Sequence, residues 1–193
     1  MKLIIIDYGA GNIKSIQFAF KRLGVDAILS NNPEEILAAD KIIFPGVGEA
    51  SSAMGMLKES GLDMLIPNLK QPVLGICLGM QLLCNSTEEG HTKGLGIFNT
   101  TVKQFSNDVK VPQMGWNVIK ELKSDLFKGI KEKEYMYLVH SYYAESCEQT
   151  IATTDYSINY ASALQHDNFY GVQFHPEKSS LAGAKLLQNF LEL

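Results

Sequence analysis

Short apolar runs alternate with helical patterns through the first half of the chain. Residues 3–6 (Leu-Ile-Ile-Ile) are continuously apolar, which is typical of a strand buried on both faces. Apolar side chains then recur at helical spacing over residues 13–23, and Gly24 follows as a stop signal. Three more strands are predicted at residues 27–29, 41–44 and 73–76. Because strands and helices alternate, we expect a parallel sheet with helices on both faces.

The second half of the chain is richer in closely spaced apolar runs that contain Tyr, Val and Thr. These runs lie at residues 100–105, 117–119, 135–139, 151–154, 161–164 and 170–173. They favour hairpins or antiparallel strands added to the sheet. A final amphipathic helix is predicted over residues 180–193. Since no repeat or linker interrupts the pattern, we predict one domain over residues 1–193, with an open, largely parallel twisted sheet flanked by helices (flavodoxin-like).

One predicted strand ends in Gly-Ile-Cys-Leu-Gly at residues 75–79, and a helical pattern begins at once. This arrangement matches the cysteine form of a nucleophile elbow, a sharp strand-to-helix turn that exposes a nucleophile at the end of a strand. Glycines flank the cysteine because a β-carbon would clash in so tight a turn. A helix N-terminus also favours the thiolate, which is the reactive form of cysteine. Taken alone, however, Cys77 fits a buried structural cysteine equally well.

A second polar group ends another apolar run, with His175 and then Glu177 following residues 169–174. A cysteine nucleophile needs a base, and the base needs an acceptor that fixes its tautomer and stabilises the imidazolium. The two residues supply both roles if their strand lies beside the strand that carries Cys77. A lone His-Pro-Glu would be an ordinary solvated strand end. Together with the elbow, it predicts a Cys77–His175–Glu177 triad.

The composition narrows the class of protein without identifying it. The chain has 193 residues, of which 46% are hydrophobic and 20% charged, as is usual for a globular protein. A formal net charge of -4 and the lack of a basic run argue against a nucleic-acid partner. No apolar stretch reaches the ~20 residues of a membrane span, and no signal-peptide pattern is present. Three cysteines without a CxxC motif argue against a disulfide framework or a metal site, so we expect a cytoplasmic protein without bound metal.

Two other signals suggest chemistry but are weaker. Asp-Tyr-Gly-Ala-Gly-Asn at residues 7–12 follows a strand like a dinucleotide-binding turn, but Lys14 occupies the position of the third glycine. His140 lies on an apolar run without an acid nearby, so we interpret it as a strand histidine that is satisfied by its neighbours and not as the base. We therefore expect no cofactor.

The motifs together resemble a known family. The Gly-x-Cys-x-Gly and His-Pro-Glu pair is similar to that of the class I (triad) glutamine amidotransferases. Within this family, the chain resembles the glutaminase subunits of imidazole glycerol phosphate synthases, over essentially its whole length. The motifs that carry the resemblance are DYGAGN at 7–12, PGVGEA at 45–50, GICLGMQLL at 75–83, MGWN at 114–117, VHSYY at 139–143 and GVQFHPEKS at 171–179.

The resemblance assigns roles to individual residues. Cys77 corresponds to the nucleophile, His175 to the base and Glu177 to the acid that orients it. Backbone N–H groups of the oxyanion site correspond to Gly48 and Leu78. The substrate-binding positions correspond to Gln81, Glu89, Ser141 and Tyr142, although Glu88 fits the acidic position nearly as well. The positions at the subunit interface and ammonia passage correspond to Asn12 and Lys178, the latter being equally well explained as a solvent-facing charge.

The same resemblance implies a reaction and a partner. The chain would hydrolyse L-glutamine to glutamate and ammonia without a cofactor. A (β/α)8-barrel cyclase subunit would form a heterodimer with it and use the ammonia to make imidazole glycerol phosphate and AICAR in histidine biosynthesis. Two alternatives stay open. The same chemistry could serve a paralogous synthase, such as one that amidates surface sugars, or the chain could be a non-catalytic interaction module on the same fold.

Overall fold

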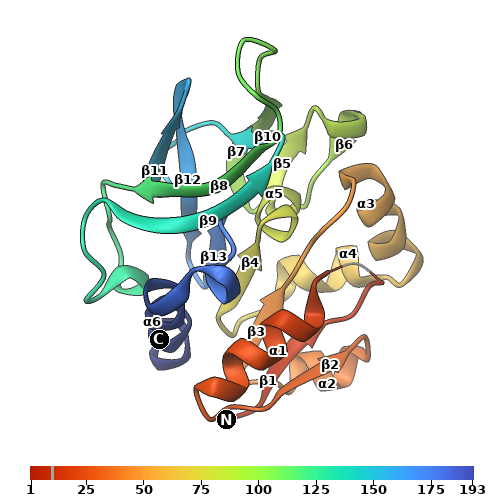
Figure 1. Cartoon of the computed structure of the whole chain (residues 1–193). Coiled ribbons are helices and arrows are strands. Elements are labelled where there is room, and N and C mark those ends of the chain that lie inside the picture. Colours follow the sequence, from red (N-terminus) through yellow and green to blue (C-terminus); the bar gives the residue numbers. More distant parts are fainter. Residues whose placement is uncertain (10) are drawn as a thin grey trace.

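The computed structural model describes residues 1–9 and 11–193, and its central feature is a parallel sheet (Figure 1). The parallel strands are β1 (Leu3–Ile6), β2 (Ala27–Ser30), β3 (Lys41–Phe44), β4 (Val73–Ile76) and β13 (Phe169–Val172). Their order is β2-β1-β3-β4-β13, and all neighbours in this order are parallel. The four strands of the first half match the predicted apolar runs to within one residue.

Beyond β13 the sheet continues in the order β12-β10-β7-β5-β6, and β11 also pairs with β12. These strands are β5 (Cys84–Thr87), β6 (Thr92–Lys93), β7 (Phe98–Gln104), β10 (Tyr142–Ala144), β11 (Thr150–Tyr156) and β12 (Ile158–His166). Their pairings are antiparallel apart from β5 with β7. A separate antiparallel pair consists of β8 (Gln113–Ile119) and β9 (Glu134–His140). The predicted antiparallel additions are confirmed, except that the predicted run at 170–173 is β13, which pairs antiparallel with β12 but parallel with β4. Strands β5, β6 and β10 were not predicted.

Helices cover both faces of the parallel strands (Figure 1). They are α1 (Ile13–Arg22), α2 (Pro33–Leu37), α3 (Ala50–Glu59), α4 (Leu62–Leu65), α5 (Leu78–Leu83) and α6 (Ser180–Glu192). Strand β1 shows why helices are needed on both faces of the sheet, because its side chains alternate between two hydrophobic clusters. Leu3 and Ile5 pack with α1 and α6, while Ile4 and Ile6 pack with α2, α3 and α4. The predicted open, largely parallel sheet flanked by helices is confirmed.

Candidate active site

The pairing of β4 with β13 brings the two predicted catalytic segments to one edge of the sheet. The strands are parallel, with Val172 opposite Ile76, and the N–H of Cys77 donates to the carbonyl oxygen of Val172 at 2.8 Å. Because parallel strands end at the same edge, the residues that follow them meet there. This adjacency is the condition that the triad interpretation required.

Cys77 sits in a strained turn between β4 and α5. Its backbone angles are φ 54° and ψ -113°, a region that residues with a β-carbon rarely adopt. The turn is tight because the following helix packs directly on β3: a β-carbon at Gly79 would lie 2.0 Å from the carbonyl oxygen of Phe44. Strain of this kind is the signature of a nucleophile elbow.

His175 is held beside the elbow by a buried acid. Its Nδ1 lies 2.8 Å from Oε1 of Glu177, and both side chains are buried. The backbone N–H of His175 donates to the carbonyl oxygen of Tyr137 at 2.8 Å, which ties the segment to β9. Burial opposes the charge of the imidazole, but hydrogen bonds to Cys77 and Glu177, with the charges of both, outweigh it and raise the pKa of His175 to about 10. The imidazolium is therefore the favoured form at neutral pH.

A cavity of about 340 Å³ opens over the sulfur. All the positions assigned to the oxyanion site and to substrate line it, together with Cys77 and His175. Lining residues from the predicted set are Gly48, Leu78, Gln81, Glu89, Ser141 and Tyr142. The structure thus brings segments that are far apart in the sequence together around one cavity.

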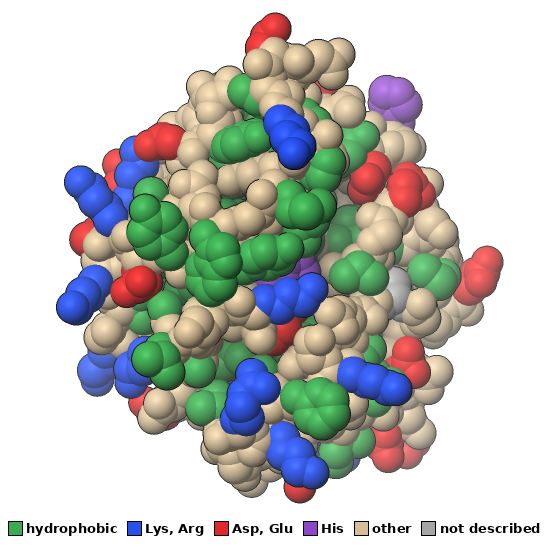
Figure 2. Space-filling view, in the orientation of Figure 1, with side chains coloured by type: hydrophobic (Ala, Val, Ile, Leu, Met, Phe, Trp, Pro, Cys, Tyr) green, Lys and Arg blue, Asp and Glu red, His purple; other side chains and the backbone are tan. Residues whose placement is uncertain are grey.

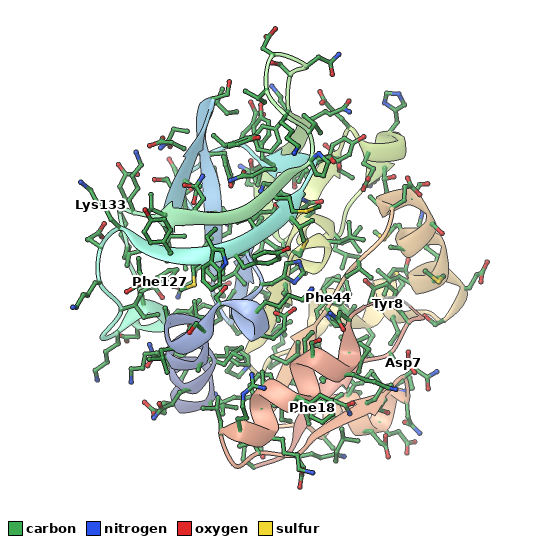
Figure 3. All side chains as sticks on the ribbon, in the orientation of Figure 1. Asp7, Tyr8, Phe18, Phe44, Phe127 and Lys133 are labelled. Carbon is green, nitrogen blue, oxygen red and sulfur yellow. The ribbon has the colours of Figure 1, made fainter. Side chains whose placement is uncertain are left out.

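The PGVG loop lines the cavity through Val47 and Gly48. Tyr8 donates to the carbonyl oxygen of Pro45 at 2.7 Å, and its ring packs at a tilted angle against that of Phe44, which anchors the start of the loop (Figure 3). Gly48 has φ +97°, a left-handed value that glycine adopts without strain. The peptide of Gly48 is therefore held in a conformation that few other residues would take.

The choice between the two neighbouring glutamates is clearer in the structure than in the sequence. Glu89 is half-buried, lines the cavity and accepts from the N–H of Ala50 at 2.9 Å. Burial raises the pKa of its carboxyl. Glu88 is exposed and accepts from the N–H of Gln104 instead. The geometry favours Glu89 for a contact with the substrate ammonium.

Asn12 and Lys178 stand apart from the residues that line the cavity. Asn12 precedes α1, and its side chain accepts from Ser15 Oγ at 3.0 Å. Lys178 is exposed, with its ammonium 5.9 Å from the ring centre of Tyr137. The short turn at residues 176–178 contacts α1, the helix that follows Asn12.

Sequence reasoning gave His140 no place at the site and did not single out Gln173. His140 lines the cavity, and its Nδ1 lies 2.7 Å from the carbonyl oxygen of Tyr142. Gln173 is fully buried, with Nε2 3.7 Å from the sulfur of Cys77. The available signal was a glutamine inside an otherwise apolar run, because a buried amide needs hydrogen-bond partners.

The fold and the site define a class: open α/β proteins with a cysteine on a nucleophile elbow and a histidine–glutamate pair beside it. The chain belongs to the class-I glutamine amidotransferase family, whose model matches residues 4–193. It is 57% identical over 196 residues to "Imidazole glycerol phosphate synthase subunit HisH" of Bacteroides fragilis, covering 100% of both chains. It is 47% identical over 200 residues to the protein of that name from Vibrio vulnificus, covering 100% of this chain and 98% of the other.

Solved structures show the same fold at lower sequence identity. A crystal structure of a glutamine amidotransferase superposes with a TM-score of 0.76 at 18% identity, covering 98% of this chain and 97% of that one. A glutamine amidotransferase from Thermotoga maritima has a TM-score of 0.64 at 15% identity, covering 100% of this chain and 83% of the other. The fold predicted from the family resemblance is therefore confirmed.

Proposed function

We propose that the chain is the glutaminase subunit of an imidazole glycerol phosphate synthase and releases ammonia from L-glutamine. The observation that carries this proposal is the convergence of Cys77, His175 and Glu177 on a cavity lined by every predicted substrate position. Full-length identity of 57% to a protein of that name supports the choice of pathway.

The chemistry is acyl transfer through a thioester. The Cys77 thiolate attacks the side-chain amide carbon of glutamine, and the N–H groups of Leu78 and Gly48 stabilise the oxyanion. His175 gives its proton to the leaving ammonia and then takes one from the water that hydrolyses the thioester. Glu177 holds the imidazole and balances its charge. Glutamate leaves, and the thiolate is restored.

The other cavity residues select free glutamine. Glu89 supplies a carboxylate for the substrate ammonium, and Gln81 supplies a polar contact near the sulfur. The backbone at Ser141 and Tyr142 lies on the same wall and would bind the substrate carboxylate. A site that recognises both charged ends of an amino acid discriminates against glutamine within a peptide.

The outer face of β8 and β9 has the character of a surface that binds another protein. Hydrophobic side chains gather over these strands (Figure 2). Met114, Trp116 and Tyr135 are each more than half exposed there. An exposed apolar patch with aromatic residues is typical of a protein interface. We propose that it binds a (β/α)8-barrel cyclase, together with the surface of Asn12 and Lys178, so that ammonia passes directly to the cyclase.

The remaining predictions concern the whole chain. We propose one domain over residues 1–193, supported by a family match that leaves out only the first three residues. Cytoplasmic location stays a prediction from the cysteine usage. In the part of the chain that the structure describes, no helix is both long and apolar enough to cross a membrane.

The partner should also regulate the site. Rotation of the peptide before Gly48 costs little because glycine tolerates both signs of φ. One missing oxyanion donor typically costs about 10²–10³ in rate. We therefore expect the isolated chain to release glutamate at least about 100-fold more slowly than the complex with the cyclase and its nucleotide substrate. Equal rates in a glutamate-release assay would contradict this gate.

The proposed function is tested by reconstitution with the histidine-pathway cyclase of the same organism. Glutamine should support formation of imidazole glycerol phosphate and stoichiometric glutamate. Ammonium salts should support the cyclase alone, as a control for its integrity. Failure of the two chains to form a complex, while glutamate is still released, would reassign the chain to a paralogous synthase. No glutamate release in any mixture would overturn the proposal.

A further inference from the structure

Hydrogen bonds between two buried amides connect the nucleophile to the substrate wall of the cavity. Nε2 of Gln173 lies 3.7 Å from Sγ of Cys77, and Oε1 of Gln173 lies 2.8 Å from Nε2 of Gln81. Nε2 of Gln81 also lies 2.9 Å from the carbonyl oxygen of Tyr142. Gln173 is fully buried, and the triad gives it no role. This series of hydrogen bonds requires each side-chain amide to have one particular orientation.

The direction of every hydrogen bond in this chain follows from one backbone atom. The carbonyl oxygen of Tyr142 can only accept, so the Gln81 group beside it is the NH₂ group. The same NH₂ group meets Gln173, so the Gln173 atom there is the oxygen. The amide group of Gln173 that faces Cys77 is therefore its NH₂ group. The carbonyl oxygen of Tyr142 thus determines that Gln173 points a hydrogen-bond donor at the sulfur.

The same reasoning fixes the free end of Gln81. Both of its amide hydrogens are used, one by Tyr142 and one by Gln173. Its Oε1 is then the amide atom left to accept from a ligand in the cavity that Gln81 lines. Gln173 thereby controls the polarity of a second residue at the site.

We propose that Gln173 is a positioning residue: its N–H stabilises the thiolate of Cys77, and its oxygen holds Gln81 with an acceptor toward the substrate. The role toward substrate rests on the proposed glutaminase function, whereas the effect on the sulfur does not. Hydrogen bonds to an ionised group are stronger than neutral ones, and full burial of Gln173 removes competing water.

Other titratable groups lie around the sulfur, and a substitution at Gln173 does not change their chemical identity. They are His175 with Glu177 behind it, Tyr8 just after β1, His140 at the end of β9, and Glu89 across the cavity. Burial raises the pKa of Tyr8, so its phenol stays neutral near pH 7. A difference between the wild type and a neutral Gln173 variant therefore isolates the amide.

The test is the pH dependence of alkylation at Cys77 by iodoacetamide, mapped by mass spectrometry. In Gln173→Met, which keeps the volume and removes the donor, the midpoint of the profile should rise by about one pH unit. In Gln173→Glu, a carboxylate replaces the donor, so the rise should be larger. The matched control is Asn189→Leu, which removes a buried amide on α6 that donates to the carbonyl oxygens of Leu126 and Lys128. It should lower the melting temperature and leave the midpoint unchanged.

An unchanged midpoint in folded Gln173→Met or Gln173→Glu would overturn the proposal. If neither variant folds, side-chain amide resonances of the ¹⁵N-labelled wild type decide. The Gln173 N–H signal should titrate with the alkylation midpoint of Cys77, and a signal that does not move would overturn the proposal. Alkylation needs no glutamine turnover, so a failure of the glutaminase proposal leaves this test intact, and the reverse also holds.

Discussion

His175 and His140 are both buried beside the same cavity, but their surroundings have opposite effects on their charge. His175 follows β13 and has Glu177 on one side and Cys77 on the other, and its pKa rises to about 10. His140 ends β9 between the carbonyl oxygen of Tyr142 and the hydroxyl of Tyr160, and burial lowers its pKa to about 4. At neutral pH one ring is an imidazolium and the other is neutral.

The difference between the two rings lies in their partners. Burial disfavours the charge of both. Only His175 has an acid and a thiol within reach, and these reverse the effect of burial. His140 has neutral partners, and its Nδ1–H is required to donate to a carbonyl oxygen. The charge of His175 lowers the pKa of His140 further. One cavity can therefore hold a charged ring that donates a proton to the leaving group and a neutral ring that donates to the backbone.

The largest expected effect is loss of turnover when Cys77 or the charged His175 is replaced. Cys77→Ala and His175→Asn should each lower glutamine-dependent synthesis by about 10⁴-fold or more, because each removes a participant in bond making. The double variant should lose little beyond either single one, since members of such a unit are not additive. Synthesis from ammonium salts in the complex should be unchanged. If Cys77→Ala kept glutaminase activity within tenfold of the wild type, the assignment of the triad would be wrong.

Removal of the acid should be milder. Glu177→Gln keeps the shape of the side chain and loses the charge that stabilises the imidazolium, without touching the reacting atoms. We expect a loss about 100-fold smaller than that of His175→Asn. Steady-state glutamate release measures both. Equal losses would mean that Glu177 takes part in bond making.

The two histidines should affect stability at opposite ends of the pH scale. The folded pKa of His175 lies above its ordinary value of 6.5, so its contribution is complete below pH 6.5 and is lost as pH rises toward about 10. The folded pKa of His140 lies below 6.5, so protonation of the unfolded chain costs stability as pH falls from 6.5 toward about 4, by about 3 kcal/mol in total. Urea unfolding measures the free energy of unfolding as a function of pH. The decrease above pH 6.5 should disappear in His175→Asn, and the decrease below pH 6.5 should disappear in His140→Asn. If the wild type and both variants had parallel profiles of unfolding free energy against pH, the opposite pKa shifts of the two histidines would be contradicted.

The smallest expected effect concerns the neutral ring itself. His140→Asn places an N–H near the position of Nδ1, whereas His140→Leu leaves the hydroxyl of Tyr160 without its ring partner. We expect His140→Leu to lower the free energy of unfolding by about 1–3 kcal/mol and His140→Asn to lower it less. Both variants should keep glutaminase activity within about tenfold, because His140 transfers no proton in the mechanism. A loss as large as that of His175→Asn would make His140 a second base.

The parallel half of the fold could be predicted from the sequence because β1, β3, β4 and β13 are buried along their whole length and consist mainly of apolar residues. Strands such as β10 (Tyr142–Ala144) are short, and their pairing with β7 and β12 depends on residues far away in the chain. The same limit applied to the site. Cys77, His175 and Glu177 sit in local motifs, whereas the amide chain from Gln173 through Gln81 to Tyr142 exists only after three segments pack together.

The central claim is that Cys77 alone forms a covalent bond with the side-chain carbon of glutamine. The most direct measurement is labelling of the reconstituted complex with a glutamine analogue that carries an electrophile at that carbon, followed by mass-spectrometric mapping of the three cysteines. We predict one label per chain, on Cys77, with protection by glutamine and no label on Cys84 or Cys147. Labelling of another cysteine, or labelling of Cys77 that glutamine does not prevent, would contradict the account.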